Sequence, residues 1–506
     1  MKKWILAALA AVMILLCGCS GRMASVFSYT ELQVGKNEAI APELEKEEPQ
    51  VTEEAPAPEQ LSEDVSVLVT HEGAFDFRQY AFTGGDEVRM GMYTAERSGE
   101  YVVLDKLTLH GDGIARWYDK ENEAWVEQPR GTGSYDANVV FFQTQTESAV
   151  VYKPLSYKDM ENDMVRYERG IDGSISVSKL DDTYTVWLTS GKTRKFGHTD
   201  WLVLTSPKND LIADWQMAEK QWKDYIIEGD NRWLYRGYYY LAPSNYIPSG
   251  KDFYHRIPSP YISVKMLDCT DRAASELSTA MLHVMLELLG DDGFFPTKAG
   301  SEWLQGEYEM GAGFFDTRFN TDLSDALLQA SEQTGIAVFR SVACAYGEFF
   351  LEHARMHHQS VGEGWLVDDY AHPEGGKPTH CSLNHQLKEI LYLYHMTDAT
   401  GDNRFEQTAD LMLLGIADVG MDWVKRNCDL WYAIDPEGQM IREDYPTLTY
   451  NDMYLLIQYL DENRPADKMY AERQLILRLM NKKLYYIISN AVEGSYYGMP
   501  GTEAVQ

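Results

Sequence analysis

The stretch Leu391-Tyr-Leu-Tyr-His-Met-Thr-Asp-Ala-Thr400-Gly401 decides the fold of the larger part of this chain. A matching stretch, Ala326-Leu-Leu-Gln-Ala-Ser-Glu-Gln-Thr334-Gly335, lies earlier, so that the Thr-Gly pair recurs after 66 residues. Each copy is predicted to be a helix, a turn and a second helix with apolar residues three to four positions apart. One such hairpin cannot bury its own apolar face, so several copies are expected to stack.

The repeat extends over most of the C-terminal half. A weaker third copy runs from Leu455 through Pro465 to a helix at 473–484, and further helices are expected from Ile212 and over 273–289. Stacked hairpins of this kind predict an all-α barrel or toroid over residues 209–506. The loops between its hairpins are expected to line the wide end.

A β-rich domain is predicted before the helices, over residues 65–208. Short β-branched and aromatic runs are separated by Gly-containing turn signals such as Gly131-Thr-Gly133. The runs begin at Ser66, Tyr101, Val139, Ser174 and Tyr184. We therefore expect a mixed, multidomain protein: a β sandwich or barrel-like domain followed by the α/α barrel.

The N-terminal residues predict export. Lys2 and Lys3 precede an apolar run from Trp4 to Leu16, which is too short to span a bilayer and typical of a signal peptide. The run ends in Leu16-Cys17-Gly18-Cys19, which resembles the cleavage box of bacterial lipoproteins and implies removal of residues 1–18 and lipidation of Cys19. Residues 19–64 are rich in Pro and Glu and are expected to form an extended linker from the outer face of a bacterial membrane.

The net charge and the residue content limit the ligands and cofactors that this chain is expected to bind. The net charge of −33, without a cluster of Lys and Arg, argues against binding nucleic acid or a highly sulfated glycan. Nothing in the sequence indicates a cofactor. Four widely spaced cysteines remain after processing, Cys269, Cys344, Cys381 and Cys428, and their spacing leaves free thiols and disulfides equally open. The oligomeric state, including a homodimer, is also open.

Three polar loops are expected to meet at one end of the helical domain. The first contains Asp316, Arg318 and Asp322, the second runs from Asp368 to His380, and the third holds Trp431-Tyr432 and Asp444-Tyr445. Asp322 also fits a simple cap for a helix starting at Leu323. His380 fits a residue at the entry of the next helix as well as it fits a ligand contact.

Residues from about Ala312 to Leu460 resemble the C-terminal domain of the D-glucuronyl C5-epimerases, which act on heparan sulfate precursors and similar polymers. The motifs that carry the resemblance are Asp369-Tyr370, Leu383-Asn384-His385, Thr400-Gly401-Asp402, Leu430-Trp431-Tyr432 and Asp444-Tyr445-Pro446. Where the family has His-Thr-Thr-His, this chain has Pro446-Thr-Leu-Thr449. The resemblance implies an α/α barrel behind a β-rich domain and epimerase activity on uronic acid residues of a polysaccharide.

The resemblance also implies site residues. Tyr370, Tyr445, Tyr432 and Asp369 are the expected catalytic groups, since epimerisation removes the C5 hydrogen α to a carboxylate and returns one to the opposite face. Residues expected to contact the substrate are Arg318, Lys377, His380, Asn384, Trp431 and Asp322. Arg318 or Lys377 would neutralise the substrate carboxylate, and no metal is expected.

Two other functions remain open. A polysaccharide lyase or glycoside hydrolase could use the same scaffold, the hydrolase by pairing Asp322 or Asp369 with Asp444. Alternatively, the chain could be a surface lipoprotein that binds an envelope glycan without catalysis. The second alternative would gain if the three tyrosines did not face one place.

Overall fold

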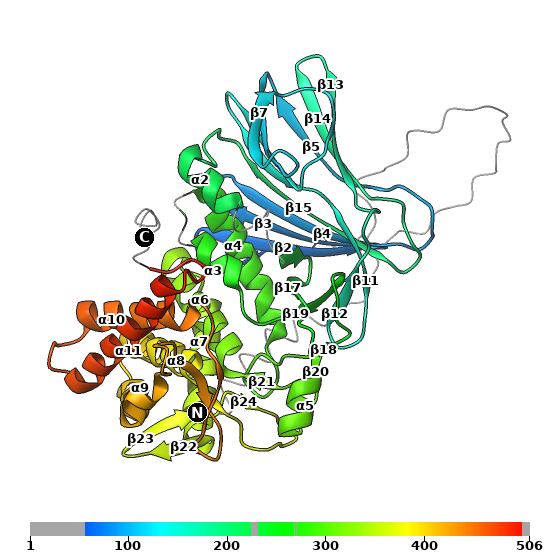
Figure 1. Cartoon of the computed structure of the whole chain (residues 1–506). Helices are drawn as coiled ribbons and strands as arrows, with labels where there is room; N and C mark the ends of the chain where they lie inside the picture. The colour runs from blue at the N-terminus through cyan, green and yellow to red at the C-terminus, as the bar shows by residue number, and fades with distance from the viewer. Residues whose placement is uncertain (1–55, 224–230, 268, 270, 498–506) are drawn as a thin grey trace.

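The computed structural model describes residues 56–223, 231–267, 269 and 271–497 (Figure 1). The predicted signal peptide, Cys19 and most of the linker lie outside the described residues. The end of the expected linker is not entirely linker, because Glu59–Gln60 form β1 and pair with β2 (Val65–Glu72). In the described part, no helix is long and apolar enough to cross a membrane.

A large antiparallel sheet organises the N-terminal half. Its main path contains β1, β2, β3 (Phe75–Phe82), β4 (Glu87–Thr94), β15 (His198–Ser206), β11 (Leu155–Asp159), β12 (Met164–Tyr167), β19 (Phe253–Arg256), β17 (Gly237–Leu241) and β16 (Asn231–Leu234). Four more strands branch from it: β10 (Ser148–Tyr152), β9 (Val139–Thr144), β6 (Gly113–Asp119) and β7 (Ala124–Pro129). The predicted strands at Ser66 and Val139 correspond to β2 and β9.

A shorter sheet packs on one face of the large sheet. It contains β5 (Val103–His110), β14 (Thr183–Thr189), β13 (Ser174–Leu180) and β8 (Gly133–Tyr135), in that order. Side chains along β14 alternate between buried and half-buried, because successive residues of a strand point to opposite faces. Val186 and Leu188 of β14 pack with Phe142 and Val203 of the large sheet to form the core between the two sheets.

Helices cover the other face of the large sheet (Figure 1). They are α2 (Trp215–Trp222), α3 (Tyr261–Leu267) and α4 (Arg272–Met285), and apolar residues of α4 share one core with Val88 and Leu204 of the sheet. Helical structure does not continue from α2 as the apolar spacing predicted. Strands β16, β17 and β19 follow and extend the large sheet past Lys208, since their Tyr-rich residues pair with each other and with β12.

The repeat folds as the sequence predicts, into three consecutive helical hairpins. They are α6 (Thr317–Thr334) with α7 (Ala337–Met356), α8 (Leu383–Thr400) with α9 (Asn403–Val419), and α10 (Leu448–Asn463) with α11 (Tyr470–Ser489). Gly335 and Gly401 end α6 and α8 with φ values of 68° and 71°, a left-handed conformation that glycine adopts without strain. The Thr-Gly pairs therefore mark true helix ends.

The hairpins lie side by side in two rows. Helices α6, α8 and α10 pack in one row, and α7, α9 and α11 pack along its outer side. The chain is thus a mixed α/β protein with sheets first and stacked helical hairpins after them (Figure 1). Closure of the hairpins into a complete barrel stays a prediction.

Candidate functional site

Short β ladders hold the three predicted loops together at one end of the hairpins. Strand β21 (Phe315–Asp316) pairs with β24 (Tyr370–Ala371), which places Asp316 opposite Tyr370. Strand β25 (Cys381–Ser382) pairs with β26 (Trp431–Ile434), and β26 pairs with β27 (Met440–Glu443) just before Tyr445. The expected convergence of these loops is therefore produced by backbone pairing between segments far apart in sequence.

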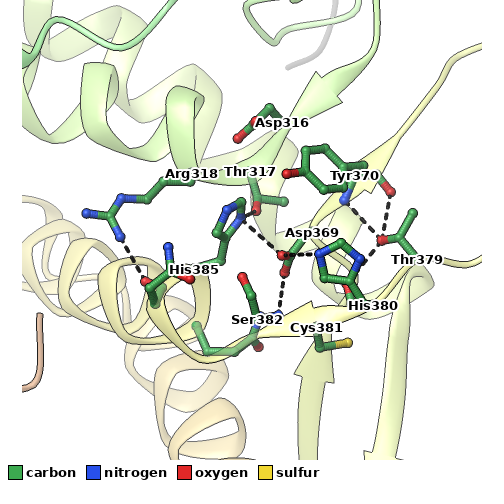
Figure 2. A network of polar contacts seen from close by, with 12 residues as sticks. Asp316, Thr317, Arg318, Asp369, Tyr370, Thr379, His380, Cys381, Ser382 and His385 are labelled. Atoms are coloured by element: carbon green, nitrogen blue, oxygen red, sulfur yellow. Dashed lines mark hydrogen bonds and ion pairs between the residues drawn. The ribbon is translucent and has the colours of Figure 1, made fainter. Parts of the chain in front are cut away.

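Asp369 lies at the centre of a buried polar network (Figure 2). Its Oδ1 accepts a hydrogen bond from the Ser382 amide at 2.8 Å, and its Oδ2 lies 3.2 Å from His380 Nε2 and 3.7 Å from His385 Nδ1. Burial acts to raise the pKa of Asp369, but His385, His380 and the Ser382 contact together lower it below its ordinary value. Asp369 is therefore an anion at neutral pH.

The two histidines have different environments. Burial lowers the pKa of His385 to about 4, so this ring is neutral at pH 7, and its Nδ1 lies 2.8 Å from Thr317 Oγ1. His380 is fully buried, with its Nδ1 2.8 Å from the hydroxyl of Tyr308. His380 thus contacts the network directly and does not act as a helix cap.

The three predicted tyrosines form a row with His380 between the first two. Ring centroids lie 5.7 Å apart for Tyr370 and His380, 5.5 Å for His380 and Tyr432, and 5.7 Å for Tyr432 and Tyr445. Tyr370 and Tyr432 are buried, whereas Tyr445 is 48% exposed and forms the open end of the row. Burial raises the pKa of all three hydroxyls, so each is a protonated phenol at neutral pH.

Asp316 also belongs to the site, although no motif in the sequence marks it as a site residue. It is the N-cap of α6, where its Oδ1 accepts from the Phe319 amide at 2.9 Å. Burial, helped by the nearby charges of Asp369 and Asp322, raises the pKa of Asp316 to about 8. After burial, the Asp316 carboxylate also helps to raise the pKa of Tyr445 and of Tyr246.

Asp322 does not cap a helix. It lies inside α6, because the helix begins at Thr317 and not at Leu323, and its carboxylate accepts from Arg318 Nε at 3.1 Å. Arg318 also forms a two-pronged pair with Asp452 of α10, at 2.8 and 3.1 Å, and donates to the Asn384 carbonyl of α8 at 3.0 Å. Arg318 therefore ties the three helices of the inner row, and its charge is already balanced by two carboxylates.

The remaining residues predicted for the site differ in how far they are exposed to solvent. Lys377 is half-exposed and pairs with Glu309 at 2.6 Å, and the Trp431 ring lies under Lys425 Nζ at 5.1 Å from its centroid. Asn384 is buried in the first turn of α8, and its side-chain oxygen has no hydrogen-bond partner in the described part of the chain. Asp444 does not stand free, since it pairs with the buried Lys483 at 2.7 Å.

Several groups of the network could not be selected from sequence. Trp303 and Tyr308 of α5 (Glu302–Tyr308) pack on Tyr370 and His380, with the Trp303 ring 5.8 Å from Tyr370 and 5.6 Å from His380. Glu389 of α8 is fully buried, and neither carboxylate oxygen has a hydrogen-bond partner among the described residues. A lone aromatic residue before the repeat, or a lone acidic residue within one of its helices, carries no pattern that marks it.

The cysteines and potential metal ligands add little to this site. All four cysteines, Cys269, Cys344, Cys381 and Cys428, have free thiols. Over the described ranges, no group of three His, Cys, Asp or Glu side chains could hold a metal ion. The side chains at this site that can transfer a proton are phenols, carboxyls and imidazoles.

Comparisons with known proteins return solved structures alone. No family model and no curated protein matches the chain. The chain is similar to a D-mannose isomerase (12% identity, TM-score 0.31, 43% of this chain and 58% of that one) and to the unsaturated glucuronyl hydrolase of Bacillus sp. GL1 (18%, 0.33, 45% and 60%). It is also similar to the cellobiose 2-epimerase of Bacillus thermoamylovorans B4167 (11%, 0.33, 45% and 57%).

All three similar structures are carbohydrate-acting enzymes, and the chain spans less than two thirds of the length of each. Identities and scores this low assign neither a family nor an activity.

Proposed function

We propose that the chain is an epimerase that inverts C5 of uronic acid residues in a polysaccharide. The observation that carries the proposal is the row of Tyr370, His380, Tyr432 and Tyr445 beside the carboxyl of Asp316. A C5 epimerase needs one group that accepts the C5 proton and another that returns a proton from the opposite face. Phenols and carboxyls grouped in this way supply both kinds of group.

The pKa values of the site side chains indicate which of them would accept a proton and which would donate one. Asp316, whose pKa is raised to about 8, is about one-tenth ionised at pH 7, and in that form it accepts the C5 proton. The protonated phenols of Tyr370 and Tyr445 serve as donors, to the developing enediolate and to C5. Asp369 stays ionised and orients His380 behind them. Lys377, at the rim, is the cation that would meet the substrate carboxylate.

Asp316 also favours a second candidate, glycoside hydrolysis. A carboxyl with a pKa of about 8 is largely protonated at pH 7 and could donate that proton to a leaving glycosidic oxygen. The ionised Asp369 would then be the second carboxylate. The two candidates use the same residues but give different products.

One experiment separates these functions. The full-length chain, solubilised in a mild detergent, is incubated in heavy water with an unsulfated glucuronan, and C5 is observed by NMR. Deuterium at C5 with intact chains supports the epimerase. New reducing ends without deuterium support the hydrolase, and an unsaturated terminus would identify a lyase. Binding without any of these products would reject catalysis in favour of a glycan-binding lipoprotein.

Two matched variants test whether deuterium incorporation at C5 depends on the row of tyrosines. Tyr445→Phe removes one hydroxyl from the row and should reduce deuterium incorporation by about 10²-fold or more. Tyr470→Phe, at a position 60% exposed at the start of α11, should leave incorporation unchanged. Equal incorporation by both variants would remove Tyr445 from the mechanism.

The proposal places the enzyme outside the cell on a lipid anchor at Cys19. The basis is the apolar run followed by Leu16-Cys17-Gly18-Cys19. Metabolic labelling with a radioactive fatty acid should mark the wild-type chain and not Cys19→Ser. An unlabelled wild-type chain that leaves the membrane without detergent would reject the anchor.

A further inference from the structure

A recess of about 240 Å³ lies in the β-rich region and shares no residue with the tyrosine site. Its walls come from Trp117 of β6, Gln128 at the end of β7 and Tyr135 of β8, and the loop through Thr132 completes it. Strand β7 pairs with β6 alone, and β8 is the last strand of the shorter sheet. The recess therefore opens where the free edges of the two sheets meet.

Two aromatic side chains form its apolar part. The rings of Trp117 and Tyr135 lie 5.3 Å apart at 85°, and Tyr135 lies 5.5 Å from Phe142 of the sandwich core at 87°. Both rings are half-buried and pack against that core. They are thus held in fixed orientations and present apolar surface without an ordering cost on binding.

Polar side chains surround these two rings. The side chains of Gln128, Thr132 and Ser134 line the recess and are exposed, and the Tyr135 hydroxyl donates to the Gly131 carbonyl at 3.5 Å. The glycines at 131 and 133 leave the space between them open, because a Cβ at either position would meet no atom within 4 Å. An amide and two hydroxyls beside an aromatic pair are suited to a ligand with both apolar C–H faces and hydroxyl groups.

The charges and the volume limit the ligand further. The lining residues include no cation, and their one carboxylate, Asp136, lies 3.3 Å from Lys153 Nζ. An anionic sugar would therefore have to compete with Asp136 for Lys153, whereas an uncharged sugar needs no counter-charge. The volume lies just below the ~300 Å³ at which pockets for small ligands begin, which suits a single ring.

We propose that this recess is a second glycan-binding site, which takes one uncharged pyranose residue of a polysaccharide between Trp117, Tyr135 and the polar groups around them. One face of the ring packs on Trp117, and its hydroxyls bond to Gln128, Thr132 and Ser134. The site holds the polymer by its neutral residues and leaves its uronic acid residues to other parts of the protein. It does not depend on which reaction, if any, the tyrosine site performs.

The test uses the full-length chain in detergent, labelled with 5-fluorotryptophan and titrated with cellohexaose, mannohexaose and N-acetylchitohexaose. The ¹⁹F resonance of Trp117 is assigned with Trp117→Phe. At least one of these neutral probes should shift that resonance in the low millimolar range, and hexaglucuronate should shift it less. Trp117→Ala removes this reporter, so its affinity for the probes is measured by isothermal titration calorimetry. It should be weakened about tenfold or more, since a large aromatic contact is lost.

Two further variants test the proposal if Trp117→Ala folds poorly. Gly131→Phe adds a side chain in the open space beside the recess and should also weaken binding. Trp187→Ala removes a comparable half-buried Trp from the outer face of β14, where Ser178 and Lys106 contact it, and should change nothing. The proposal is overturned if no neutral probe moves the Trp117 resonance, or if Gly131→Phe binds the probes as tightly as Trp187→Ala.

Discussion

Two buried charge clusters lie next to each other in this protein, and they differ in how well their charges are balanced. Around Arg318, every close carboxylate has a partner, because Asp322 and Asp452 both accept from one guanidinium. Around Asp316, a carboxyl lies near two others, Asp369 and Asp322, and its pKa rises to about 8. The first arrangement stabilises the helical rows, and the second keeps a proton available.

This difference in charge balance distinguishes a structural carboxylate, Asp322, from a functional one, Asp316, at the start of the same helix. Asp316 and Asp322 both belong to the start of α6, and both are buried. A buried charge that is fully paired contributes to structure, whereas a buried carboxyl without a cation costs stability when it ionises. Perturbed groups of the second kind concentrate at functional sites. Substitutions in the two clusters should therefore have opposite effects on stability.

The largest loss is expected for Arg318→Met. This change leaves Asp322 and Asp452 buried without their cation, and breaking such a pair costs about 3–5 kcal/mol in the free energy of unfolding. Urea unfolding monitored by circular dichroism measures the loss. The double variant Arg318→Met/Asp452→Asn should recover part of it, since one of the stranded charges is removed. A loss below about 1 kcal/mol would mean that the tie is not structural.

A smaller loss, of about 3 kcal/mol, is expected for Lys483→Met. The fully buried Lys483 ammonium contacts Asp429, Asp444 and the carbonyl of Tyr445, each at 2.7 Å. Its removal should release the segment that carries Tyr445, so hydrogen exchange should rise there before the rest of the chain unfolds. Lys425→Met is the matched control, because Lys425 pairs with the same Asp429 at 3.2 Å but makes no contact with Tyr445. Equal exchange in the two variants would contradict this role.

Asp316→Asn should change stability in the opposite direction at high pH. Folding raises the pKa of Asp316 from 3.8 to about 8, so the folded chain keeps a proton that the unfolded chain loses between these values. Its contribution to stability is complete below about pH 4 and falls as the pH rises to about 8. Asn keeps the N-cap and cannot ionise, so the variant should be more stable than wild type above pH 8.

Asp322→Asn is the control for this prediction. It makes the same chemical change in the same helix but removes a partner of Arg318, so it should destabilise the protein instead. Unfolding curves of the three proteins from pH 4 to 9 provide the comparison. If Asp316→Asn lowers stability at pH 9 as Asp322→Asn does, the two clusters do not differ as we argue.

Local signals in the sequence were sufficient for the helical hairpins. The Thr-Gly pairs end α6 and α8 because a glycine in the left-handed conformation closes a helix by itself, without any distant contact. The strands β16, β17 and β19 were not predicted. They join the large sheet through β19, which pairs with β12, more than eighty positions earlier, while β16 and β17 pair with each other and with β19. Periodicity over a short window cannot detect such a partner.

The site, like the fold, was predictable where local motifs mark it and not where distant contacts decide it. The three tyrosines and Asp369 were found through motif order, and the structure brings them together with His380. Asp316 was missed because the start of α6 was placed at Leu323, and a helix start six residues earlier changes which aspartate is the cap. Arg318 was assigned to the substrate because its partner Asp452 lies 134 residues away in the sequence. Charge balance in a folded interior is decided by such distant pairs.

The smallest effect on stability is expected for Lys377→Ala, which tests the remaining predicted cation. Lys377 and Glu309 are 54% and 63% exposed, so their pair at 2.6 Å should contribute less than about 1 kcal/mol. Arg318 and Lys377 were both expected to meet the substrate carboxylate, and only the second keeps its charge near solvent and opposite a single acid. Lys377→Ala should therefore raise KM for the uronic polymer about fivefold and leave kcat unchanged. Glu309→Ala removes the competing acid and should lower KM instead; if neither variant changes KM, Lys377 does not bind the substrate carboxylate.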